Sequence, residues 1–180
     1  MSKVTFVKKA RKDNAVCKKG ESYYWWQFAY CAAQLSKLPP KPSQLMRSEF
    51  LSTIYELCER IEACDVDTPE EVADFIEEVK DEIECLRDET QDKLDNMPDQ
   101  LQDAKTGQMM QERIDGCDEM ISSLEDIDCD VDLDAIKVEV EGDPSWNKTD
   151  EDKEARTAEL LGEKACELVG ELQMISYDGA

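Results

Sequence analysis

The sequence contains no histidine. This absence removes the commonest general base and the commonest zinc ligand of proteins, and with them the Ser-His and Cys-His arrangements of nucleophilic catalysis. The eight cysteines are scattered, and no two of them form a C-x-x-C pair. We therefore expect a non-enzymatic protein with no catalytic residues, no metal site and no cofactor, in which most thiols are reduced and buried.

Long apolar runs are also missing. No stretch approaches the roughly 20 apolar residues that a membrane-spanning helix requires, and residues 1–14 have no signal-peptide core. We therefore expect a cytoplasmic protein that does not enter a membrane. The length of 180 residues suits one ordinary domain, or a small module attached to a helical body.

Charged residues are divided unequally along the chain. Residues 1–47 contain ten Lys or Arg and two acidic residues, which gives +8, whereas residues 48–180 contain eleven Lys or Arg and 42 acidic residues, which gives −31. Together they make the net charge of −23. This charge attracts basic proteins and repels nucleic acid at long range, so we expect electrostatic recognition of a partner.

Aromatic residues are concentrated in the basic segment, and six of them lie between Tyr23 and Tyr30. Such a cluster predicts a β-strand with Tyr24, Trp26, Phe28 and Tyr30 on one face. Residues 4–7 and 34–38 are expected to add two strands, and the prolines at 39, 40 and 42 to end the sheet. We thus predict a basic, antiparallel three-stranded sheet module over residues 1–42.

This module has two interpretations. Aromatic side chains among cations bind single strands by base stacking, and a small sheet can enter the major groove of DNA. A nucleic-acid-binding surface would comprise Lys8, Lys9, Arg11, Lys12, Lys18, Lys19, Tyr23 and Trp25. Alternatively, the Tyr24 face packs on a helix, because so small a sheet cannot bury a core alone. We favour packing for the Tyr24 face and leave both interpretations open for the face of Tyr23 and Trp25.

Beyond the prolines, apolar residues recur at helical spacing. Thr68 and Pro69 predict a helix start, and Thr149 with Asp152 predicts another through a capping box; a further helix should follow Gly107. Four inward stripes are expected: Phe50, Ile54, Leu57, Ile61 and Cys64; Val72, Ile76, Val79, Ile83 and Leu86; Met110, Ile114, Cys117, Ile121 and Leu124; and Ala158, Leu161, Ala165, Leu168 and Leu172. The spacing predicts an elongated antiparallel helical bundle or coiled coil over residues 43–180, which is compatible with a homodimer. The fold class is therefore α+β.

Every second residue from Asp126 to Asp134 is acidic, and apolar residues follow. This alternation predicts a short strand near residues 127–141, with a carboxylate face that discourages aggregation. The acidic positions also resemble an EF-hand loop counted from Asp128 or Asp130. However, Leu133 or Ala135 stands where the loop requires glycine, so we expect no calcium site.

Carboxylates are dense on the second predicted helix as well. Such runs are ordinarily solvated faces, but few cations oppose them here, and rows of carboxylates can imitate a phosphate backbone. The predicted partner-binding surface comprises Glu70, Glu71, Asp74, Glu77, Glu78, Asp81, Glu82, Asp126, Asp128, Asp130, Asp132 and Asp134.

Several stretches are similar to uncharacterised accessory proteins of tailed bacteriophages, namely residues 18–26 (KKGESYYWW), 96–102 (NMPDQLQ), 106–108 (TGQ) and 111–115 (QERID). The resemblance implies a phage protein acting in the host cytoplasm, and it carries no activity. The basic module also resembles the three-stranded arm-type DNA-binding domain of phage integrases. It departs from that domain at Ala32 and Ala33, where a turn usually holds glycine or a polar residue, and no catalytic domain follows.

These observations favour one function over two alternatives. The first is an acidic phage protein that inhibits a basic host protein, such as a nucleic-acid-binding defence enzyme, by DNA mimicry. The second is a nucleic-acid-binding module that acts through the basic segment. The third is a structural virion or assembly protein held together by its helical seams.

Overall fold

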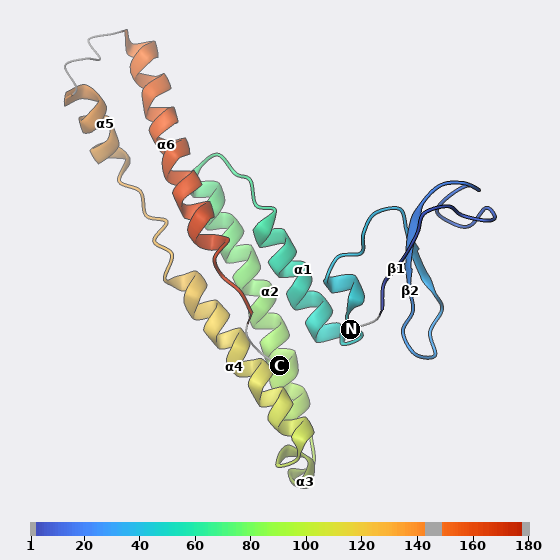
Figure 1. Ribbon diagram of the computed structural model, residues 1–180. Coiled ribbons are helices and arrows are strands. Elements are labelled where there is room, and N and C mark those ends of the chain that lie inside the picture. Colours follow the sequence, from blue (N-terminus) through green and yellow to red (C-terminus); the bar gives the residue numbers. More distant parts are fainter. Residues whose placement is uncertain (1–2, 143–148, 178–180) are drawn as a thin grey trace. The chain divides into compact units, whose positions relative to one another are not determined.

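The computed structural model describes residues 3–142 and 149–177 (Figure 1). The chain forms two compact units, residues 1–59 and residues 60–180. The predicted boundary between the sheet module and the helical body, at residues 42 and 43, lies inside the first unit. The η1 turn (Ser43–Leu45) and most of helix α1 (Glu49–Glu62) belong to that unit.

The N-terminal sheet has the predicted three strands. They are β1 (Thr5–Val7), β2 (Tyr23–Trp26) and β3 (Gln34–Ser36), and they pair antiparallel in the order β1-β2-β3. Tyr24 lies opposite Phe6 on one side and Ser36 on the other. The prediction of a small antiparallel sheet at the N-terminus is confirmed, and with the helices that follow it confirms the α+β class.

The face of Tyr24 is used for packing. The rings of Tyr24 and Phe6 lie 4.8 Å apart, and Trp26 is buried and donates a hydrogen bond from its indole Nε1 to the carbonyl of Gln44 in η1. The predicted alternation of aromatic side chains along the strand is wrong at Tyr30. Tyr30 is fully exposed with a φ of 66°, because β2 ends at Trp26 and the chain turns.

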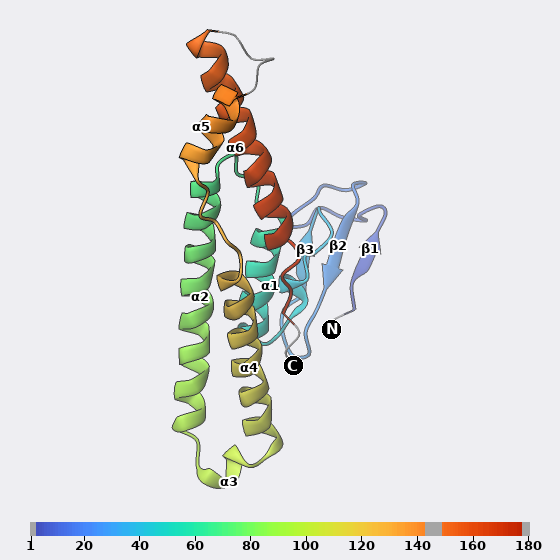
Figure 2. The ribbon, with the colours of Figure 1, turned by 90° about the vertical axis from the view of Figure 1, so that its left-hand side faces the viewer.

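The second unit is helical (Figures 1 and 2). Its helices are α2 (Pro69–Asp95), α3 (Asp99–Gln102), α4 (Lys105–Glu125), α5 (Leu133–Gly142) and α6 (Asp150–Leu172). Helix α4 packs along α2 and runs back beside it, while α6 packs on both α2 and α5. The helical-bundle character expected from the spacing is therefore present in this unit.

The four apolar stripes are largely buried, as predicted. The exceptions are Leu86, Met110 and Leu161, which are half-buried, and Ala158, which is exposed. The two α6 exceptions belong to its N-terminal part, where α5 is the packing partner.

Two helix starts follow their sequence signals. Thr68 caps α2 by accepting a hydrogen bond from the amide of Glu71 at 3.3 Å, and Pro69 occupies the first turn. Thr149 and Asp152 form the predicted capping box of α6, in which Asp152 accepts a bond from the Thr149 amide. Both caps satisfy backbone donors that the first helical turn leaves unpaired.

The strand predicted near residues 127–141 is wrong. Residues 128–132 have no regular structure, and α5 begins at Leu133. The reason is local: Asp128 Oδ1 accepts a bond from the Asp130 amide, and Asp132 Oδ1 accepts bonds from the amides of Asp134 and Ala135 at 3.0 Å each. Short acidic side chains that bond the following backbone amides favour turns and helix starts over strands.

All eight cysteines are free thiols. Only Cys17, Cys64 and Cys117 are buried, so the expectation that most would be buried is wrong. Cys85 and Cys166 lie on the exposed faces of α2 and α6.

Candidate acidic surface and basic loop

The predicted acidic residues of α2 are all exposed. Ten carboxylates lie between Glu70 and Glu89, against the two cations Lys80 and Arg87. A helix rises about 1.5 Å per residue, so this is roughly one carboxylate per 3 Å, close to the spacing of about 3.4 Å per phosphate in one DNA strand. The helix therefore displays a linear charge density similar to that of a nucleic-acid strand.

Some of these charges are neutralised within the unit. Arg60 pairs with Glu78 at 2.7 Å and with Glu82 at 2.6 Å, and these carboxylates, Glu82 foremost, raise the pKa of the guanidinium. Lys80 pairs with Glu125 of α4 at 2.9 Å. In the part of the chain that the structure describes, five of the predicted α2 residues make no ion pair: Glu70, Glu71, Asp74, Glu77 and Asp81.

A groove of about 580 Å³ gathers further carboxylates. Its polar lining combines the residues between α4 and α5 with side chains of α6, and its apolar lining includes Val131, Ile136 and Leu168. Lys164 is the cation among its lining residues, and it pairs with Glu167 at 2.6 Å. We name this the acidic groove; its carboxylates are Asp126, Asp128, Asp130, Asp132, Glu167 and Glu171.

Sequence reasoning found four of these six carboxylates and missed Glu167 and Glu171. The signal for the two missed residues was their spacing of four on the last predicted helix, which places them on one face. Their proximity to Asp126 and Asp128 depends on how α6 folds back, which local spacing does not reveal.

The two predicted acidic segments meet at the start of α2. Glu70 and Asp130 line one pocket of about 300 Å³, together with Cys129. Burial, with smaller effects of Asp128 and Glu171, raises the pKa of the Cys129 thiol, so it stays protonated at neutral pH. Asp134 does not line either pocket; it lies in the first turn of α5, 3.9 Å from Lys137.

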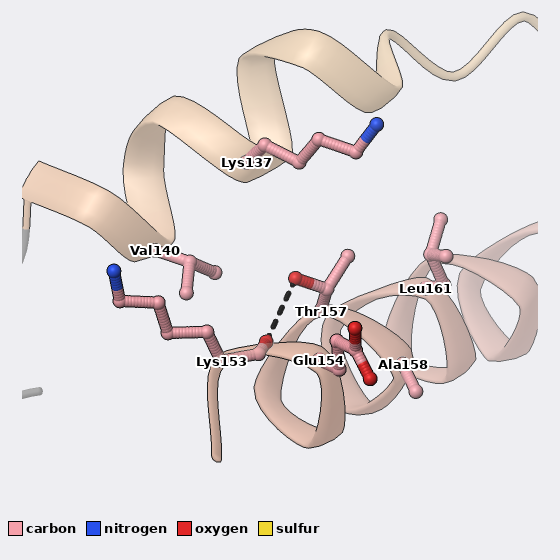
Figure 3. Close-up of a pocket in the computed structure, with 7 residues that line it drawn as sticks. All are labelled: Lys137, Val140, Lys153, Glu154, Thr157, Ala158 and Leu161. Carbon is pink, nitrogen blue, oxygen red and sulfur yellow. Dashed lines mark hydrogen bonds between the residues drawn. The ribbon is translucent and has the colours of Figure 1, made fainter. Parts of the chain in front are cut away.

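A third pocket of about 430 Å³ lies between α5 and α6 (Figure 3). Val140, Ala158 and Leu161 give it apolar walls, and Lys137 and Lys153 flank it. The hydroxyl of Thr157 is occupied by a hydrogen bond to the Lys153 carbonyl. Its lining combines the two lysines with the carboxylate of Glu154.

The six predicted cations all lie on the connection between β1 and β2, residues 8–22, which we name the basic loop. Lys8, Lys9, Arg11, Lys12, Lys18 and Lys19 are exposed. Within the described residues none of them pairs with a carboxylate. Tyr23 and Trp25 follow the loop on β2 and are half-buried.

The basic loop is held by its own backbone. Ala10 donates to the carbonyl of Glu21 at 2.8 Å and accepts from Gly20 at 2.9 Å, and Ala10 and Cys17 are buried. Asn14 Oδ1 accepts bonds from the amides at positions 16 and 17. Gly20 has a φ of 98°, a conformation that side-chain-bearing residues rarely adopt.

The two acidic side chains of this loop are engaged by backbone amides. Asp13 Oδ1 accepts a bond from the amide of Lys19 at 2.7 Å, and Glu21 Oε2 accepts one from the amide of Lys18 at 2.9 Å. The Lys18 amide, and next Lys37 at 3.3 Å, lower the pKa of Glu21.

Metal binding has no support in the described ranges, where no group of three or more cysteine, aspartate or glutamate side chains is placed to hold an ion. The segment that resembled an EF-hand loop enters α5 at Leu133, where a calcium loop would still be turning. No helix in the described part of the chain has the length and apolar character needed to cross a membrane. No protein-family model, curated protein or solved structure matches this chain.

Proposed function

We propose that this protein is a non-enzymatic acidic phage protein that binds a basic host protein, such as a nucleic-acid-binding defence enzyme, and occupies its nucleic-acid site. The binding surface consists of the unpaired carboxylates of α2 and the acidic groove. The observation that carries the proposal is that carboxylates from α2, from residues 126–132 and from α6 converge on adjoining pockets.

The net charge of residues 60–180 supports this proposal over the alternative that the carboxylates form only a solvated face. Residues 60–180 contain eleven Lys or Arg and 39 of the acidic residues, which gives −28. Repulsion among so many like charges destabilises the compact state, and the ion pairs found among the described residues relieve only part of it. Binding of a cationic cleft releases counterions held near this surface, as it releases those condensed on DNA.

The test begins with co-purification of the tagged full chain from nuclease-treated bacterial lysate, followed by purification of the captured basic protein. Two variants of equal charge are then compared for affinity. The surface variant is Glu70→Gln, Asp74→Asn, Glu77→Gln and Asp81→Asn; the control is Asp99→Asn, Asp103→Asn, Glu112→Gln and Glu119→Gln on α3, its C-terminal cap and α4.

All eight substituted residues are exposed, so both variants should fold. We expect the surface variant to bind at least about tenfold more weakly, which is about 1.4 kcal/mol, and to lose the ability to displace DNA from the partner. The control should bind as the unaltered protein does. Equal losses of affinity in both variants would show that the effect comes from net charge alone. Unaltered binding by the surface variant would refute the proposed surface.

A further inference from the structure

The cations of this protein differ in whether a carboxylate lies close to them. In residues 60–180, carboxylates lie within 4 Å of Arg60, Lys80, Arg87, Lys93, Lys137, Arg156 and Lys164, whereas Lys105 and Lys153 make no ion pair among the described residues. Among the described residues of the first unit, the six cations of the basic loop have no such partner. Two things account for this: residues 1–47 contain only two acidic residues, Asp13 and Glu21, and the loop engages both of them.

The fold of the loop maintains this isolation. Both acidic residues of the loop bond to its own backbone amides, and the carboxylate of Glu21 is further taken up by Lys37. The cross-loop bonds of Ala10 and the burial of Cys17 fix the backbone that carries the six side chains. Cations held on an ordered backbone lose less freedom on binding an anion than cations on a mobile tail.

We propose that the basic loop is a binding site for the phosphate backbone of nucleic acid. Phosphates are the fitting ligand because ammonium and guanidinium groups bind them through charge-assisted hydrogen bonds. Six neighbouring unpaired cations match a polyanion better than they match a single small anion. This site lies in the first unit and does not depend on the proposed function of the acidic surface.

The aromatic residues of β2 argue against base stacking as the main contact. Tyr23, Tyr24 and Trp25 are half-buried, the ring of Tyr24 packs against that of Phe6 in a tilted arrangement, and Trp26 is buried. A stacking platform presents open ring faces to successive bases. The loop therefore reads phosphate rather than sequence, and binding should depend steeply on salt.

The experiment measures fluorescence anisotropy of a labelled DNA duplex and a labelled single strand of equal length, with the full chain. Titrations at several salt concentrations give the slope of log K against log[salt], and each phosphate contact contributes about 0.9 for a duplex and about 0.7 for a single strand. The loop variant is Lys8→Gln, Lys9→Gln and Lys12→Gln. The control is Lys93→Gln, Lys105→Gln and Lys137→Gln, which lowers the net charge equally from exposed positions in residues 60–180.

We expect binding at low salt, with a duplex slope that falls in magnitude by about 2 to 3 in the loop variant and hardly changes in the control. Thermal unfolding of both variants, compared with that of the unaltered protein, checks that the exposed substitutions leave the fold intact. Three results would overturn the proposal: no binding to either DNA at low salt, equal loss in both variants, or tight single-strand binding with a shallow slope that the loop variant does not alter.

Discussion

The turn between α2 and α4 depends on Gly107, and replacing this residue with alanine gives a sharp test of the fold. A Cβ at this position would lie 2.0 Å from the carbonyl oxygen of Gln102, whereas real Cβ contacts stay beyond 3.0 Å, so the backbone must move by about 1 Å. Gln102 also donates from its side chain to the carbonyls of Leu94 and Met97 and thereby closes the turn.

Two effects of Gly107→Ala oppose each other. Alanine favours a helix over glycine by about 1 kcal/mol, because it reduces the freedom of the unfolded chain. Overpacking costs about 1 to 3 kcal/mol, and each hydrogen bond of Gln102 that is lost costs about 1 kcal/mol more. The steric and hydrogen-bond losses should exceed the gain in helix propensity, so the free energy of unfolding should fall by about 1 to 3 kcal/mol.

Gly170→Ala in α6 is the matched control. Nothing lies within 4 Å of the added Cβ, so only the gain in helix propensity, about 0.5 to 1 kcal/mol, should remain. Urea unfolding followed by circular dichroism measures both variants. The reasoning would be refuted if Gly107→Ala were as stable as the unaltered protein, or if both substitutions shifted stability in the same direction.

Two further predictions concern stability. Thr68→Ala removes the acceptor of the Glu71 amide at the start of α2 and should lower the free energy of urea unfolding by about 1 kcal/mol. The control Ser122→Ala, on the exposed face of α4, should change this free energy very little. Equal effects of the two substitutions would contradict the role of Thr68 as a helix cap. Burial raises the pKa of Cys117 from 9.0 to about 11, so the unfolded state loses this proton first as pH rises. The free energy of unfolding should therefore fall between about pH 9 and pH 11, and this thiol should contribute at most about 3 kcal/mol to the fall. In Cys117→Ala the fall should be shallower. An unchanged pH profile in that variant would contradict the raised pKa of Cys117.

The elements that sequence predicted well are those specified by local signals. The aromatic run gave β2, and the caps at Thr68 and Thr149 gave the starts of α2 and α6 within a residue. The stripe from Val72 to Ile83 is buried because three-four spacing puts these side chains on one helical face. In each case the signal and the structure involve neighbouring residues.

The failures arose where two local rules competed. Alternating acidic residues from Asp126 onward satisfy the periodicity of a strand, but Asp128 and Asp132 bond to backbone amides ahead of them, and that chemistry decided the outcome. The short α3 escaped prediction because four residues show no periodicity. Glu167 and Glu171 escaped because only tertiary folding brings them to the acidic groove.

Charge counts alone also missed the difference between paired and isolated cations. Arg60 and Lys80 reach carboxylates 18 or more positions away, so their neutralisation is a tertiary effect. The isolation of the basic loop is instead local, because its acids bond to the amides of Lys18 and Lys19.

Salt weakens both proposed interactions in the same direction, since each replaces counterions with a charged partner. Salt dependence therefore cannot tell them apart, and only charge-matched variants can: the loop variant should leave binding to a basic protein intact, and the α2 surface variant should leave the slope for DNA unchanged.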